Sequence, residues 1–89
     1  MNISQLVRDF QTGGFFDLRE VRTGEQAVPL HYAPVDRVYV VLEGAMEIVC
    51  NGGVCWAESG SYVFIPAGRF HAHTVTADGC RYLLASRPW

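Results

Sequence analysis

The three histidines of this chain, His31, His71 and His73, are its strongest candidates for chemistry. His71 and His73 are two residues apart in a segment typical of a strand, so their imidazoles lie on the same face of that strand. Neutral imidazoles bind zinc, iron, copper or nickel, and three of them would leave coordination positions open for water or substrate. Each histidine could equally be a hydrogen-bonded residue of a pocket.

Arg37 and Tyr39 form a second pair with strand spacing, and they also share a face. A guanidinium is permanently charged and only donates hydrogen bonds. An inward-facing Arg37 would therefore repel a divalent metal ion and would hold a carboxylate or phosphate. The alternative for Arg37 is a surface position with a salt bridge to Asp36 or Glu43. Tyr39 is either a core residue or a catalytic one.

A helix and many short strands are predicted to position these side chains. Apolar residues recur at helical spacing from Ile3 to Phe10 and are followed by Gly13, which predicts one short N-terminal helix. Later segments rich in β-branched and aromatic residues predict an all-β sandwich or barrel. The predicted strands are residues 15–22, 27–32, 37–50, 54–58, 61–65, 70–76 and 81–86, and the predicted turns are Thr23–Gly24, Asn51–Gly53, Ser59–Gly60, Pro66–Gly68 and Asp78–Gly79.

Two stretches of the chain are similar to conserved motifs of a known family. Gly60, Pro66, Gly68 and His71 follow the spacing Gly-x5-Pro-x-Gly-x2-His, which resembles the second motif of the cupins. The stretch from His31 to Gly44 resembles their first motif. The resemblance implies a single domain over residues 1–89 with a double-stranded β-helix, a jelly-roll barrel that is open at one end. It also implies that the motif histidines point into a pocket and commonly hold a divalent metal.

The usual cupin site has three histidines and one glutamate, and this chain retains only part of it. By resemblance, His31 matches the first histidine and His71 the third, whereas Ala33 takes the place of the second and Arg37 that of the glutamate. His73 could complete a substituted three-histidine site for Zn, Fe, Ni or Mn. Asp36 could turn inward only if a bulge or Pro34 shifted its register.

Three functional hypotheses stay open, and we favour a small-molecule-binding cupin whose substituted site can hold a metal. The first is a metal-dependent enzyme, an oxygenase or isomerase, that uses His31, His71 and His73. The second is a metal-free binder or isomerase-like enzyme in which Arg37 holds an anion and His71, near Tyr39, serves as acid or base. The third is a non-catalytic sensory or structural dimer.

Composition bounds the partners of the chain. The net charge is −2, and the seven basic residues are arginines spread without a cluster, which disfavours nucleic acid. The longest apolar runs, such as Val38–Leu42, fall far short of the roughly 20 residues that span a bilayer. The N-terminus does not resemble a secretory signal, so we expect a cytoplasmic protein. The resemblance implies a homodimer, and the candidates for its interface or for the core are Phe15, Phe16, Trp56 and Trp89.

Overall fold

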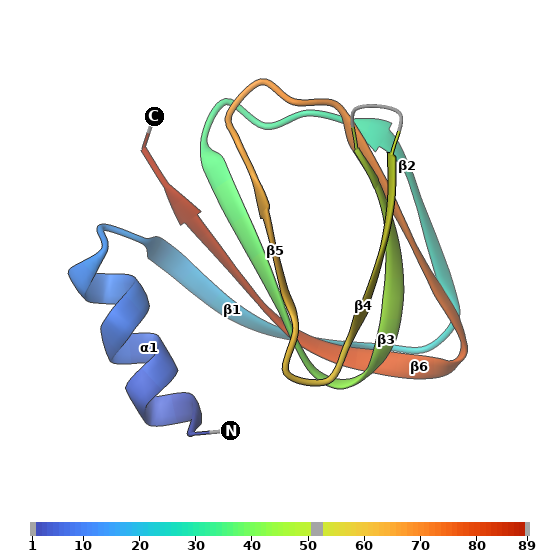
Figure 1. Ribbon diagram of the computed structural model, residues 1–89, viewed down its shortest axis with the longest axis horizontal. Helices are drawn as coiled ribbons and strands as arrows, with labels where there is room; N and C mark the ends of the chain where they lie inside the picture. Colours follow the sequence, from blue (N-terminus) through green and yellow to red (C-terminus); the bar gives the residue numbers. More distant parts are fainter. Residues whose placement is uncertain (1, 51–52, 89) are drawn as a thin grey trace.

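Two long strands form the frame of the molecule, and shorter strands pair with each half of them (Figure 1). The structure is a computed structural model that describes residues 2–50 and 53–88. Its elements are α1 (Ile3–Thr12), β1 (Phe16–Thr23), β2 (Gln26–His31), β3 (Asp36–Cys50), β4 (Gly53–Glu58), β5 (Tyr62–Ile65) and β6 (His71–Arg87). The predicted all-β fold with a short N-terminal helix is confirmed.

The antiparallel pairing of β3 with β6 extends from one end of the barrel to the other. It begins where Asp36 pairs with Arg87 and ends where Cys50 pairs with His71. The first half of β3 also pairs with β5 and its second half with β4. In the same way, β2 pairs with the first half of β6 and β1 with the second. Each half of the β3–β6 pair is therefore the centre of one layer, and the two layers enclose the core.

Both long strands bend where they pass from one layer to the other. The register between β3 and β6 shifts on either side of Gly44. Gly44 has a φ of 81° and Gly79 a φ of 82°, a backbone region that L side chains rarely adopt. A Cβ on Gly44 would overlap with the carbonyl oxygen of Gly79. The two strands can cross this closely because both residues are glycine.

The predicted turn at Asp78–Gly79 is wrong as a strand boundary. Residues 70–76 and 81–86 were expected as separate strands, but β6 runs without interruption through both. The positive φ of Gly79 bends the chain while the hydrogen-bonded ladder continues on either side, as in a bulge. The turns at Gly60 and Gly68 are confirmed, with φ values of 90° and 79°. Asn51 and Gly52 of the predicted hairpin turn lie outside the described residues.

The space between the layers is filled by a buried apolar cluster. Its β3 members alternate along the strand, as side chains on one face must. Arg37 has the same phase as Tyr39 and so also faces the interior. Cys50, Val21, Val63 and Leu84 pack against the cluster. The cluster itself comprises Tyr39, Val41, Met46, Ile48, Ala57, Ile65, Val75, Cys80 and Tyr82.

The helix α1 covers part of the outer face of one layer. The Asn2 side chain caps it by accepting a hydrogen bond from the Gln5 amide at 3.0 Å. Leu6 and Phe10 pack against the outer residues of β3 and β6, yet no helix residue is fully buried. A groove of about 650 Å³, lined mainly by apolar side chains, lies between α1 and the sheet. No helix among the described residues is long and apolar enough to cross a membrane.

The aromatic residues singled out from the sequence differ in their surroundings. Phe15 packs under α1, whereas Phe16 and Trp56 are 48% and 52% exposed. Trp89 lies outside the described residues.

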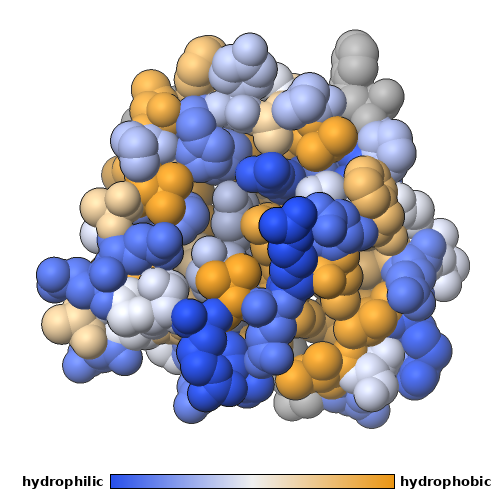
Figure 2. All heavy atoms as spheres, turned by 180° about the vertical axis from the view of Figure 1, so that it is seen from behind, coloured by the Kyte–Doolittle hydropathy of each residue, from blue (hydrophilic) through white to orange (hydrophobic). Residues whose placement is uncertain are grey.

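On the face opposite to the view of Figure 1, apolar and hydrophilic residues interleave (Figure 2).

The strand crossing gives a direct stability test. We expect Gly44→Ala to lower the free energy of unfolding by more than about 1 kcal/mol, because the new Cβ meets the Gly79 carbonyl and the positive φ becomes strained. Urea denaturation measures this change. The control is Gly24→Ala, whose Cβ meets open space and for which we expect a change of about 0.5 kcal/mol or less. Equal effects of the two substitutions would contradict the close crossing of β3 and β6 at Gly44 and Gly79.

Candidate functional site

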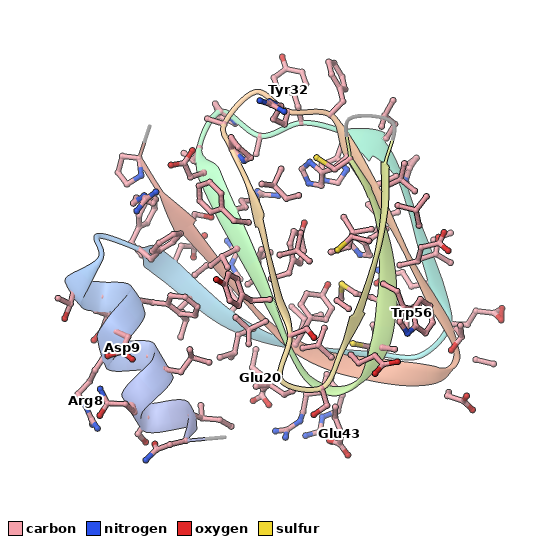
Figure 3. The ribbon with its side chains drawn as sticks, in the orientation of Figure 1. Arg8, Asp9, Glu20, Tyr32, Glu43 and Trp56 are labelled. Carbon is pink, nitrogen blue, oxygen red and sulfur yellow. The ribbon has the colours of Figure 1, made fainter. Side chains whose placement is uncertain are left out.

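The three histidines meet at one end of the barrel interior. His71 and His73, at the start of β6, are 1% and 5% exposed, as expected for inward-facing residues. His31, at the end of β2, is the ladder partner of His71, and a register shift between Val28 and His31 brings it there. The His31 and His71 ring centroids are 4.2 Å apart. Tyr32, the residue after His31, marks this end of the barrel, and Glu20 and Glu43 mark the opposite end (Figure 3).

Backbone carbonyls fix the orientation of two of these rings. Nδ1 of His31 lies 2.9 Å from the Pro29 carbonyl oxygen, and Nδ1 of His71 lies 3.0 Å from the Arg69 carbonyl oxygen. A carbonyl oxygen only accepts hydrogen bonds, so Nδ1 carries the proton and donates in both cases. In the neutral rings, Nε2 therefore presents a lone pair.

Tyr39 contacts His71 from the opposite layer. Its hydroxyl lies 3.4 Å from Nε2 of His71, and because Nε2 has the lone pair, the hydroxyl donates. Burial raises the pKa of Tyr39, and the nearby charge of Arg37 only partly opposes this effect. Tyr39 therefore keeps its proton at neutral pH. The sequence left open whether Tyr39 is a core or a catalytic residue; the structure places it in the buried core cluster, in contact with His71, and its catalytic role stays a prediction.

Arg37 lies in the interior without a counter-charge. None of the ion pairs among the described residues includes it, and its Nε is buried with no hydrogen-bond partner there. The salt bridges of Arg37 with Asp36 or Glu43 that the surface alternative requires are not formed, because Asp36 pairs with Arg87 at 3.2 Å and Glu43 pairs with Arg81 at 3.1 Å. The charge of Arg37 instead reaches Tyr39, where burial raises the pKa and Arg37 only opposes that rise, and His71, where burial lowers the pKa and Arg37 is a minor further cause.

Asp17 and Asp36 are the acids to consider as partners of Arg37. Hydrogen bonds from Arg19, at 2.7 and 3.2 Å, are the main cause of the lowered pKa of Asp17, and the field of Arg37 is a smaller one. Asp36 does not turn inward. Its carboxylate accepts hydrogen bonds from the Ala67 amide at 2.9 Å and from Arg87, so it fastens the loop after β5 to the start of β3.

His73 is buried with both ring nitrogens unpartnered among the described residues. Its ring packs against those of Tyr39 and Tyr82, with centroids 5.7 Å and 6.2 Å away. Burial is the main cause that lowers the pKa of His71 and His73, and the neighbouring His31 adds to it. Both rings are therefore neutral at pH 7. The sequence analysis missed Tyr82, because the alternation in residues 81–86 does not say which face points inward.

Comparison with known protein families shows to which family the chain belongs. A family profile described as the cupin domain matches residues 18–85. This chain belongs to the cupin family. The predicted jelly-roll fold is thereby confirmed, with β3 and β6 of this cupin as its long bent strands. A comparison with curated proteins found no match.

Solved structures share the fold of this cupin at low sequence identity. A protein of unknown function from Rhizobium leguminosarum superposes with a TM-score of 0.73 at 23% identity, over 81% of this chain and 69% of that one. A putative mannose-6-phosphate isomerase from Ralstonia eutropha superposes with a TM-score of 0.75 at 20% identity, over 86% of this chain and 77% of that one. The DMSP lyase DddQ from Ruegeria pomeroyi superposes with a TM-score of 0.68 at 24% identity, over 79% of this chain and 36% of that one. At these identities the similarity shows the fold alone.

The side chains of this cupin, as placed, do not fit a divalent metal. His31 and His71 each offer Nε2, but the hydroxyl of Tyr39 contacts the Nε2 of His71 and the charge of Arg37 faces that ring. Across residues 2–50 and 53–88, no group of three or more histidine, cysteine or acidic side chains could hold a metal ion. Binding of Zn, Fe, Ni or Mn by His31, His71 and His73 stays a prediction from the sequence.

Elemental analysis of protein purified without an affinity tag or chelator tests this metal site. We expect substoichiometric metal that does not change in the double variant His31→Ala, His71→Ala, because two imidazoles beside a guanidinium make a weak site. Near-stoichiometric metal that is lost in the double variant would establish the histidine site instead.

The lowered histidine pKa values predict how stability depends on pH. In the unfolded chain both histidines titrate near about pH 6.5, whereas in the folded state they stay neutral to lower pH. The unfolded state then binds more protons, so stability is complete above about pH 6.5 and is lost as pH falls from there toward the folded-state values. Urea denaturation between about pH 7.5 and 5.5, with a chelator present, measures the slope. We expect a shallower slope for His73→Leu, and an unchanged slope would refute the assignment.

Proposed function

We propose that this cupin binds a small organic anion inside the barrel, with Arg37 as its anchor and without a requirement for metal. The observation that carries the proposal is the guanidinium of Arg37, which forms no ion pair among the described residues and whose buried Nε has no hydrogen-bond partner there. A partly buried charge without a counter-charge is costly. A carboxylate or phosphate would remove that cost through paired, charge-assisted hydrogen bonds.

The neighbours of Arg37 suit an anion better than a cation. His71 and His73 are neutral because burial lowers their pKa, and Tyr39 is neutral because burial raises its pKa. Arg37 therefore places a fixed positive charge beside three buried side chains, Tyr39, His71 and His73, that are neutral at pH 7. His31 and Arg37 are only partly buried, so they mark the side from which a ligand would reach the cluster.

His71 also has the geometry of a proton acceptor. Its Nδ1 is fixed by the Arg69 carbonyl, its lowered pKa keeps the ring neutral, and its Nε2 lone pair faces the interior. These properties favour the acid–base role predicted for His71 beside Tyr39 and Arg37. Binding of an anion comes first in this proposal, and a reaction of the bound anion is a second step.

The structural relatives help to choose the ligands to test. One is named as a putative mannose-6-phosphate isomerase, and its name refers to a phosphorylated sugar. Sugar phosphates therefore belong in a ligand screen beside short carboxylates. Carboxylates and phosphates can each accept two parallel hydrogen bonds from a guanidinium.

Titration of chelator-treated protein with carboxylates and sugar phosphates, followed by calorimetry or NMR, tests the proposal. We expect Arg37→Ala to weaken binding of the best anion at least about tenfold, since a hydrogen bond to a charged group contributes about 1.5–3 kcal/mol. The affinity of Arg37→Lys should lie between those of the wild type and Arg37→Ala, because an ammonium keeps the charge but cannot form the paired hydrogen bonds. The matched control, Arg22→Ala, removes an exposed arginine of β1 and should leave affinity unchanged. Equal affinity in wild type and Arg37→Ala would refute the anchor.

Two other expectations stay predictions. The exposed aromatic side chains of Phe16 and Trp56 suit the expected homodimer, and sedimentation analysis of the protein would test it. The cytoplasmic location rests on the sequence argument alone.

A further inference from the structure

His73 is a buried polar side chain that anion binding at Arg37 does not explain. It is 95% removed from solvent, and neither ring nitrogen has a partner among the described residues. A neutral imidazole has one N–H donor and one acceptor. Each buried donor or acceptor that lacks a hydrogen bond costs about 1–3 kcal/mol. Its ladder neighbours, Ile48 and Val28, are both apolar. For packing alone, an apolar residue would be the more stable choice here.

The nearby polar groups do not satisfy His73. The hydroxyl of Tyr39 is directed to Nε2 of His71 at 3.4 Å, although the ring of Tyr39 lies 5.7 Å from that of His73. Tyr82 approaches edge-on at 6.2 Å between centroids without a hydrogen bond to His73. The donor and the acceptor of His73 therefore have no hydrogen-bond partner among the described residues.

Tyr39 connects this open group to the charged one. Arg37 and Tyr39 are adjacent on the inner face of β3, and the charge of Arg37 acts on the Tyr39 hydroxyl. The ring of Tyr39 contacts His73 across the barrel. A permanently charged donor and a neutral donor–acceptor thus lie on two sides of one tyrosine.

We infer that the ligand has two polar ends, an anionic head at Arg37 and a neutral hydrogen-bonding group, such as a hydroxyl, at His73. This inference rests on the proposed anion site and specifies its ligand class as small hydroxy acids and their phosphorylated counterparts, not plain carboxylates. A hydroxyl both donates and accepts, so one such group can satisfy either tautomer of His73. His73 is then a specificity-determining residue. A ligand that lacks the group leaves the imidazole unpaired, which is how buried polar sites reject incomplete analogues.

Matched acids test this inference on chelator-treated protein. The probes are butanoate and its 2-, 3- and 4-hydroxy derivatives, which differ only in the presence and position of the hydroxyl. We expect at least one hydroxy isomer to bind about tenfold or more tightly than butanoate, in line with about 1–3 kcal/mol for a satisfied buried group. In His73→Leu this ratio should fall to about one, while the affinity for butanoate stays the same.

Two variants and one further measurement complete the design. His73→Gln keeps a donor and an acceptor and should retain part of the discrimination, and the control Thr74→Ala, an exposed neighbour, should retain all of it. If His73→Leu does not fold, the ¹⁵N shifts of the wild-type His73 ring decide, since they should move with the preferred hydroxy acid and not with butanoate.

The possible failures are distinguishable. Equal affinity for all four acids, with binding still dependent on Arg37, would overturn the role of His73 and leave the anion site intact. Loss of discrimination in Thr74→Ala as well as in His73→Leu would also overturn it. If neither the wild type nor Arg37→Ala binds any of the acids, both the anion site at Arg37 and the role of His73 are overturned.

Discussion

The antiparallel ladder between β3 and β6 holds both layers of this cupin together. Every other strand pairs with one of these two, so the position of each interior side chain depends on their register. The register changes only where the strands bend, next to Gly44, and the close approach to Gly79 makes that bend possible. Beyond the bend, the ladder sets Cys50 opposite His71 and Ile48 opposite His73. The geometry of the site therefore follows from a crossing at the far side of the core.

Burial determines the electrostatics of the site. Removal from water lowers the pKa of His71 and His73 and raises that of Tyr39, so each of these three side chains favours its neutral form beside the charge of Arg37. In the usual cupin arrangement a glutamate would occupy the place of Arg37, and the sign of the charge at that position is reversed here. A pocket with one fixed positive charge and neutral hydrogen-bonding walls attracts anions and repels metal cations. In the proposed function, the preference of this barrel for an anion thus follows from Arg37 and its surroundings.

Sequence reasoning predicted the helix, most strands and the shared face of His71 and His73, because these depend on local periodicity and on turn residues. The inward direction of that face was an implication of the resemblance to the cupin motifs. It could not choose between the interior and a salt bridge for Arg37, since alternation says which residues share a face and not which face is buried. It divided β6 at Gly79, because a glycine that bends a strand and one that ends it look alike in a sequence. The contact of Tyr82 with His73 joins opposite layers, and only the bend of β6 brings the two together.

The central claim is that Arg37 presents an unpaired positive charge to the barrel interior. Crystals of the metal-free protein soaked in bromide would test it most directly, because anomalous scattering locates the anion without assuming a ligand. The account predicts a bromide ion within hydrogen-bonding distance of the Arg37 guanidinium, on the side that faces Tyr39 and His71. A guanidinium turned away from the interior and paired with Asp17, with no bromide beside it, would contradict the account.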